Sequence, residues 1–208
     1  IATLLICFAC KETEKKTDTN DLVAKTTIKI SGYFENIGDL TKITLNDFSG
    51  QQHKIIAEAL VKNNSFEFEI PKPNNVTILT LGVNGIEGYV PIIAHESDLV
   101  LRMNLKRIYL SDVSGDNAND AFSFYKKEKY KYDNQITSIG ELSNMPNVTE
   151  EMKKTFQQRI TEFKTATKEA YLKMFNDNLN NFTSGLILED LFREQIVSAN
   201  EGLNMFEK

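Results

Sequence analysis

The sequence has 208 residues, of which 41% are hydrophobic and 25% are charged, and its net charge at neutral pH is −5. This length and hydrophobic content allow one large domain or two smaller ones with a proper core. The single basic run, Lys126 to Lys131, is interrupted by Glu128 and is typical of a solvated helix face. Because nucleic-acid binding needs a clustered basic surface, we expect no nucleic-acid partner.

The amino terminus has the pattern of a targeting segment. Residues 1–9 are apolar or small, Cys10 follows, and a polar run extends from Lys11 to Asp21. This order is typical of the end of a secretory signal peptide, a cleavage point and a flexible tether. The alternative is a buried amino-terminal strand, Thr3 to Phe8, in a cytosolic protein. We favour the signal peptide, because a core strand would seldom run straight into a dozen residues without an apolar anchor.

The region from Thr26 to Pro71 predicts four strands. Apolar residues recur there at or near the two-residue period of a half-buried strand. Turn-forming residues separate the four segments at 36–38, Ser49-Gly50 and Asn63-Asn64. We expect an antiparallel meander with one face toward a core.

Four more strands are predicted after Pro71. The segments are Val76–Val83, Gly88–Ala94, Leu99–Leu105 and Arg107–Leu110, and Asn84-Gly85 between the first two is a strong hairpin signal. About eight strands at roughly ten-residue spacing predict a sandwich. The β region is expected to end at Ser114-Gly115.

Beyond residue 115 the hydrophobic period changes from 2 to 3.6, which predicts helices. The first helix is expected to begin with a capping arrangement of Asn117 and Asp120 and to end near Gly140. Its apolar stripe includes Tyr125 and Tyr132, which we expect to pack onto the sheet.

The second helix is the longest that the sequence predicts. Asn147 or Thr149 is its expected cap, and it extends to about Asn180, long enough to lie along a whole sandwich. A shorter helix then begins at Thr183 or Ser184. A capping box, Ser198 to Glu201, opens a last one.

The predicted fold class is therefore α+β, an antiparallel β-sandwich of about eight strands followed by a helical segment with one long helix. The expected division is residues 1–10 for the end of a lipoprotein signal peptide and 11–25 for the tether. Residues 26–115 form the sandwich, and 116–208 form a helical segment packed on it, with a further domain expected to follow.

Several segments in this order carry a family resemblance. They are the lipobox-like Cys10, Ile30–Tyr33, Ile43–Leu45, Lys62–Phe68, Asp98–Leu101, and Val113–Gly115 with Asn119 leading into helices. The chain resembles the amino-terminal domain of unknown function that precedes a thioredoxin-like domain in Bacteroidetes-type lipoproteins. Cys7 departs from that pattern, since it replaces the usual leucine of the lipobox.

The resemblance implies that Cys10 becomes the lipid-bearing first residue after signal-peptide cleavage. The protein would then be lipid-anchored in the cell envelope, with the membrane and a thioredoxin-like domain or envelope protein as partners. In such relatives a later C-x-x-C pair performs thiol–disulfide exchange, and residues 11–208 contain no cysteine. The resemblance therefore assigns no redox role to this segment itself.

Other candidate sites have ordinary interpretations. His53 and His95 are the only histidines and lack the neighbouring ligands that a zinc site needs. Asp112, Ser114 and Asp116 imitate the start of a calcium loop without its glycine and glutamate, so a turn and a helix cap are expected. We expect no catalytic, metal or cofactor-binding residue here, and Cys10 is the one candidate modification site.

Three functional hypotheses follow. The first is a non-catalytic envelope lipoprotein module that positions a partner or a thioredoxin-like catalytic domain. The second is a stand-alone binding module for a peptide or glycan, with a groove between the sheet and the long helix. The third is an enzyme that uses scattered carboxylates.

Overall fold

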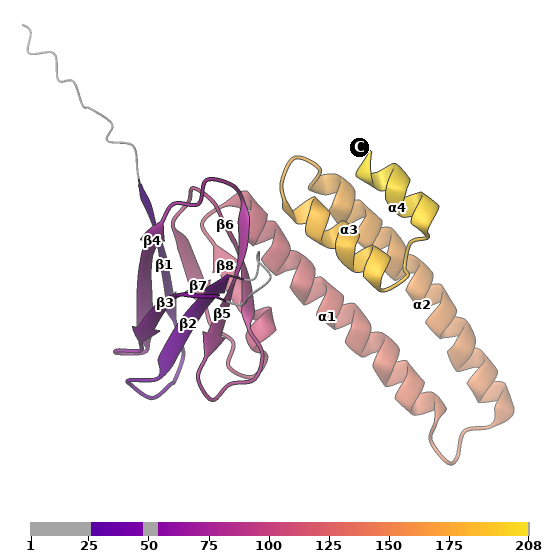
Figure 1. Ribbon diagram of the computed structural model, residues 1–208. Helices are drawn as coiled ribbons and strands as arrows, with labels where there is room; N and C mark the ends of the chain where they lie inside the picture. The colour runs from indigo at the N-terminus through magenta and orange to yellow at the C-terminus, as the bar shows by residue number, and fades with distance from the viewer. Residues whose placement is uncertain (1–25, 48–53, 208) are drawn as a thin grey trace, which may run out of the picture.

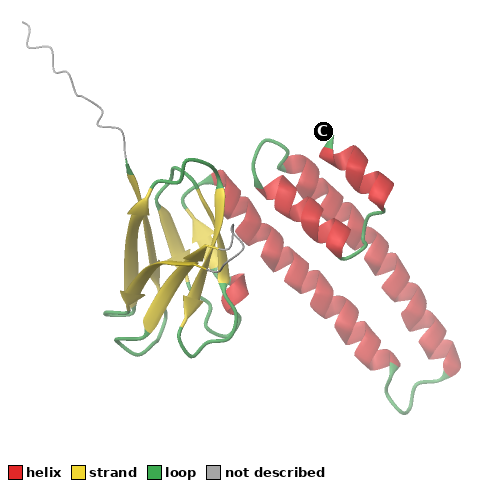
Figure 2. Cartoon of the chain, in the orientation of Figure 1, coloured by secondary structure: helices red, strands yellow, loops and turns green. Residues whose placement is uncertain are grey.

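The computed structural model describes residues 26–47 and 54–207, and these form a mixed α+β structure. Eight strands in two four-stranded sheets come first, and four helices follow (Figure 2). The predicted α+β class, the strand number and the order of elements are confirmed. Within the described ranges, no helix is both long and apolar enough to cross a bilayer.

The strands have the following bounds: β1 Thr27–Tyr33, β2 Lys42–Asp47, β3 Lys54–Leu60, β4 Ser65–Pro71, β5 Thr77–Val83, β6 Val90–Ala94, β7 Leu99–Arg102 and β8 Asp112–Ser114. The helices are η1 Ile108–Leu110, α1 Asn117–Ser143, α2 Glu150–Asp177, α3 Thr183–Arg193 and α4 Ala199–Phe206. Residues 107–110, predicted as a strand, instead contain the 3-10 helix η1. α1 is nearly as long as α2, with 27 residues against 28.

The two sheets have the strand orders β4-β1-β7-β8 and β3-β2-β5-β6. The predicted meander is therefore wrong, because β1 and β2 lie in different sheets. In the first sheet β1 pairs antiparallel with β4 and parallel with β7, while every pair in the second sheet is antiparallel. Alternation of apolar residues specifies which face of a strand is buried, but it does not specify the neighbouring strand.

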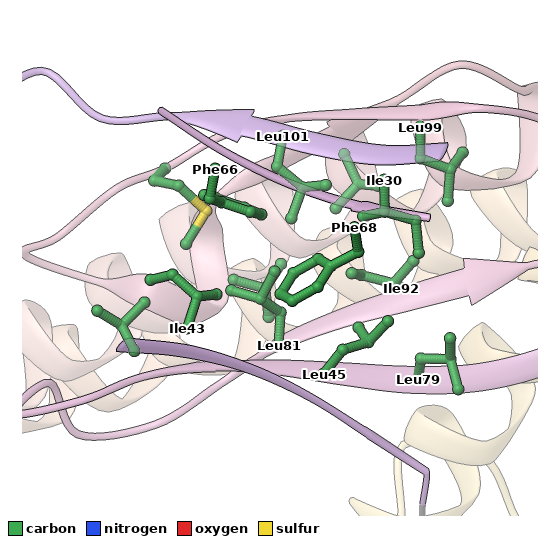
Figure 3. Packing of buried hydrophobic residues seen from close by; sticks show 14 of the residues in the cluster. Ile30, Ile43, Leu45, Phe66, Phe68, Leu79, Leu81, Ile92, Leu99 and Leu101 are labelled. Atoms are coloured by element: carbon green, nitrogen blue, oxygen red, sulfur yellow. The ribbon is translucent and has the colours of Figure 1, made fainter. Parts of the chain in front are cut away.

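One hydrophobic cluster takes its residues from both sheets. Along β4 the burial alternates strictly, so that Phe66, Phe68 and Ile70 point inward. Leu45 on β2 and Leu81 on β5 belong to the same cluster, and Figure 3 shows these side chains facing a common interior. The alternation read from the sequence therefore identified the core-facing side of these strands.

The helices begin where short polar side chains can accept from free backbone N–H groups. Asp116 caps α1 by accepting from the Asn119 N–H at 2.8 Å, so the cap is Asp116 and not the predicted Asn117. Thr149 caps α2, and Ser198 with Glu201 forms the predicted capping box of α4.

The junction between β8 and α1 depends on Gly115. Its φ of +127° is costly for any residue with a side chain, and a Cβ there would lie 2.2 Å from the carbonyl oxygen of Asp98. The predicted end of the β region at Ser114-Gly115 is therefore confirmed.

The helices form an arm that extends away from the sheets (Figure 1). The start of α1 contacts β6 and β8, whereas α2 runs back antiparallel to α1 and packs against α1 and α3. Tyr125 and Tyr132 contact Tyr171 of α2, with ring centroids 5.8 Å apart in each case. They belong to a hydrophobic cluster that consists mostly of helix residues and includes Ile93 of β6.

One polar face of α1 joins the edges of both sheets. The Asn119 side chain bonds both backbone groups of Ile93 in edge strand β6, at 3.0 Å to the N–H and 2.7 Å to the carbonyl. One turn later, the Ser123 hydroxyl accepts from the N–H of Val113 in edge strand β8 at 2.9 Å and donates to its carbonyl at 3.0 Å. Since β6 and β8 belong to different sheets, this face of α1 connects the two sheets along one side.

Replacement of Asn119 by alanine tests this connection. Asn119→Ala leaves the N–H and C=O of Ile93 buried without partners, so we expect a loss of about 2–4 kcal/mol in the free energy of unfolding. Urea denaturation followed by circular dichroism measures it. Asn134→Ala, at an exposed position of the same helix, is the control and should change stability by less than about 0.5 kcal/mol. Equal stability of the two variants would contradict the proposed connection.

Candidate ligand-binding groove

The outer face of the second sheet is partly covered by helices, and a groove of about 780 Å³ remains between them. Leu79 and Leu81 of β5 point into the core, so the residues that alternate with them, Ile78 and Thr80, face outward. α3 lies on the opposite side and contributes Leu186. We call this space the aromatic groove.

Three aromatic side chains line the aromatic groove and remain partly exposed. Tyr89 precedes β6, Tyr109 lies in η1, and Phe182 precedes α3, with exposed fractions of 52%, 39% and 41%. Gly88 allows η1 to approach the chain just before Tyr89, because its φ is +92° and a Cβ at Gly88 would lie 2.9 Å from a methyl group of Ile108. Exposed aromatic side chains around an apolar groove are typical of binding sites.

A buried carboxylate also lines the aromatic groove. Asp190 of α3 accepts from the Tyr125 hydroxyl at 3.2 Å and forms an ion pair with Arg193. Burial is the main cause that raises the pKa of Asp190 above its usual range, and Arg193 opposes this effect. Burial, with the charge of Asp190, also raises the pKa of Tyr109 to about 12, so this tyrosine stays neutral and can donate a hydrogen bond at physiological pH.

Thr80 adds an unpartnered hydroxyl to the same groove. Its side chain is buried, and Thr80 Oγ1 has no hydrogen-bond partner within the described protein. Buried polar atoms are nearly always paired with protein, water or ligand. The aromatic groove therefore offers a hydrogen-bonding group as well as apolar walls.

A second cavity of about 480 Å³ adjoins the groove and shares Tyr109, Asp190 and Arg193 with it. Lys126 lines this cavity and is almost completely buried. Its Nζ donates to the carbonyl of Ser111 at 3.2 Å and lies 5.3 Å from the centre of the Tyr109 ring. Removal from water lowers the pKa of Lys126 to about 8.

The residues that the sequence singled out lie elsewhere. Cys7, Cys10 and His53 are outside the described residues, so their predicted roles remain predictions. His95 follows β6 with its Nε2 3.8 Å from Glu96, and its side chain is exposed. In the described ranges no group of three His, Cys, Asp or Glu residues could hold a metal ion.

The residues that imitate the start of a calcium loop have the structural roles expected of a turn and a helix cap. Asp112 pairs with Lys127, the Ser114 hydroxyl donates to the Val100 carbonyl, and Asp116 caps α1. The ring of Tyr130 also has a partner within the protein, because the guanidinium of Arg107 lies over it, 4.8 Å from the ring centroid.

Sequence reasoning missed the residues of the aromatic groove, although two signals were present. Ile78 in β5 is apolar on the face opposite Leu79, which indicates that both faces of the strand are covered. Asp190 lies within the apolar stripe of α3, between Ile187 and Leu191, and a charge at such a position is typically paired or functional.

The sequence was also compared with models of known protein families and with curated proteins. Neither comparison finds a match. The resemblance to the amino-terminal domains of thioredoxin-like lipoproteins therefore remains a prediction from the residues.

The lowered pKa of Lys126 predicts a pH dependence of stability. Between pH 8 and 10.5 the unfolded chain holds the Lys126 proton more tightly than the folded chain does, so stability rises with pH in this window. The predicted quantity is the difference in free energy of unfolding between the unchanged protein and Lys126→Met. This difference should increase by about 2–3 kcal/mol from pH 7 to pH 10. Parallel urea titrations at several pH values measure this difference, and a constant difference would refute the assignment.

Proposed function

We propose that this chain is a non-catalytic, lipid-anchored binding module of the cell envelope, in which the aromatic groove holds an extended peptide segment of a partner protein. The observation that carries the proposal is the groove itself, which three partly exposed aromatic side chains and a buried carboxylate line. In this proposal the two sheets form a β-sandwich, which the shared hydrophobic cluster supports.

The chemistry of the groove favours a peptide with an apolar and a basic side chain. Tyr109, Tyr89 and Phe182 offer apolar and aromatic surface for the first. Glu189 is exposed at the rim and offers a carboxylate for the second. The unpartnered Thr80 hydroxyl can bond a peptide backbone group.

Selection from a random peptide library on the intact chain tests the groove. Peptides enriched on the unchanged protein should bind Tyr109→Ala about tenfold more weakly, since a central aromatic contact is typically worth more than 1 kcal/mol. Fluorescence polarisation measures the affinity.

Tyr33→Ala is the matched control, because Tyr33 is similarly exposed but lies on β1, outside the groove. Binding to Tyr33→Ala should be unchanged. Enriched peptides that bind both variants equally well, or the absence of any enriched peptide, would overturn the peptide assignment.

The proposed anchor is tested at Cys10. The intact gene product, expressed in a bacterium that processes lipoproteins, should enter the membrane fraction and carry a diacylglyceryl group on Cys10 by mass spectrometry. Cys10→Ser should leave the protein in the soluble envelope fraction. Unmodified Cys10 in the intact product would remove the lipid anchor from the proposal.

A second candidate function is the accessory domain of a thioredoxin-like oxidoreductase, and an exposed apolar patch favours it. Phe192 at the end of α3 lies near Gly202 of α4, and Leu203 and Phe206 share a face of α4. These side chains are 56%, 58% and 79% exposed, which is typical of a surface that a further domain covers. The complete coding sequence decides, since this candidate requires a thioredoxin-like segment with a C-x-x-C pair after Lys208.

A further inference from the structure

A third cavity, of about 500 Å³, lies between α1, α2 and the segment that follows α3. In Figure 1 α1 and α2 run side by side along the arm, and the α1 residues that line the cavity, Asp133 and Ile136, belong to the half of α1 farther from the sheets. We call it the interhelical cavity. It does not share any lining residue with the aromatic groove, so a ligand site in this cavity is independent of the proposed peptide site.

Two buried hydroxyl groups without partners line the interhelical cavity. Thr167 and Tyr171 of α2 are 6% and 1% exposed, and neither Thr167 Oγ1 nor Tyr171 OH has a hydrogen-bond partner within the described protein. The residues are four positions apart, so they lie one above the other on the same face of the helix. Both residues line the interhelical cavity, so one ligand in it lies beside both side chains.

The other threonines of α2 show that this arrangement is particular to Thr167. The hydroxyls of Thr155, Thr161 and Thr165 each donate to the carbonyl four residues earlier, at 3.0–3.1 Å. Such a bond is the ordinary way for a helical threonine to satisfy its hydroxyl group. Thr167 does not form it, although Thr167 is the buried one and therefore loses more by remaining unpaired.

The surroundings of the two hydroxyls are polar and nearly balanced in charge. Asp133 and Glu194 line the cavity and are both paired with Lys129, and Lys164 and Lys168 line it from α2. No single sign of charge therefore dominates, which disfavours a simple ion as the ligand. Side chains that donate and side chains that accept surround the same space.

Apolar side chains complete the wall of the cavity. They come from three different segments, α1, α2 and the residues after α3: Ile136, Ile160 and Ile196. A ligand that fits must therefore offer several hydroxyl groups that both donate and accept, together with an apolar C–H surface. Sugars have this combination.

We propose that the interhelical cavity binds a sugar, with hydroxyl groups of the ligand bonded to Thr167 Oγ1 and Tyr171 OH. This site would give the helical arm a binding function separate from that of the sheets. A buried hydroxyl group is costly when unpaired and favourable when it is hydrogen-bonded. A ligand bound in the cavity therefore stabilises the packing of α2 on α1.

A panel of monosaccharides, including glucose, galactose and N-acetylglucosamine, tests the proposal on the whole chain. Binding is measured by isothermal titration calorimetry and by chemical-shift changes at α2. Tyr171→Phe and Thr167→Val keep the shape of each side chain and remove only its hydrogen-bonding capacity. Each should weaken the binding of the recognised sugar by about tenfold.

Matched controls are Thr155→Val on α2 and Tyr130→Phe on α1, which lie outside the lining of the cavity. Both should bind the sugar as the unchanged chain does. If no sugar binds at concentrations up to about 10 mM, or if all four variants bind alike, the proposal is overturned. A high-resolution structure with ordered water alone on the two hydroxyls, in the presence of the sugar, would overturn it as well.

Discussion

The hydrogen bonds from one face of α1 to the edge strands of both sheets are the interaction on which the other features depend. Asn119 and Ser123 satisfy the outward backbone groups of β6 and β8, and these strands belong to different sheets. An exposed strand edge invites pairing with another chain, so the same bonds protect both edges. Lys126 continues the row and donates to Ser111, which immediately follows η1.

The fixed start of α1 also determines where the binding surfaces form. Thr183 at the start of α3 donates to the carbonyl of Ala118 at 2.7 Å, so α3 is joined to α1 close to the sheets. Tyr125 and Asp190 make a second bond between these helices. As a result α3 lies opposite β5 and β6, and the aromatic groove lies between them.

The buried hydroxyl groups without partners give both proposed sites a common physical basis. Within the described ranges, Thr80, Thr167 and Tyr171 hold the buried side-chain atoms without a hydrogen bond, and all three residues line a cavity. The core of the sheets, in contrast, is filled by aliphatic and aromatic side chains (Figure 3). The unpaired hydroxyl groups of the described residues therefore belong to side chains that line the two proposed sites.

The sequence by itself determined most of the local structure. Alternation located the core faces of β2 and β4 but not that of β3, where Ile55 and Leu60 are exposed. Asn63-Asn64 and Gly85 take the positive φ of turns, and Thr149 and Ser198 cap the helices as predicted. These features depend on residues within a few positions of one another, so a single chain segment contains the information. Only the tertiary structure decided which strands pair, that Arg107–Leu110 contains η1, and where α2 packs. The aromatic groove joins β5, η1 and α3, and the interhelical cavity joins α1, α2 and the end of α3. Both sites depend on contacts between segments far apart in the sequence, whose partners local periodicity does not specify.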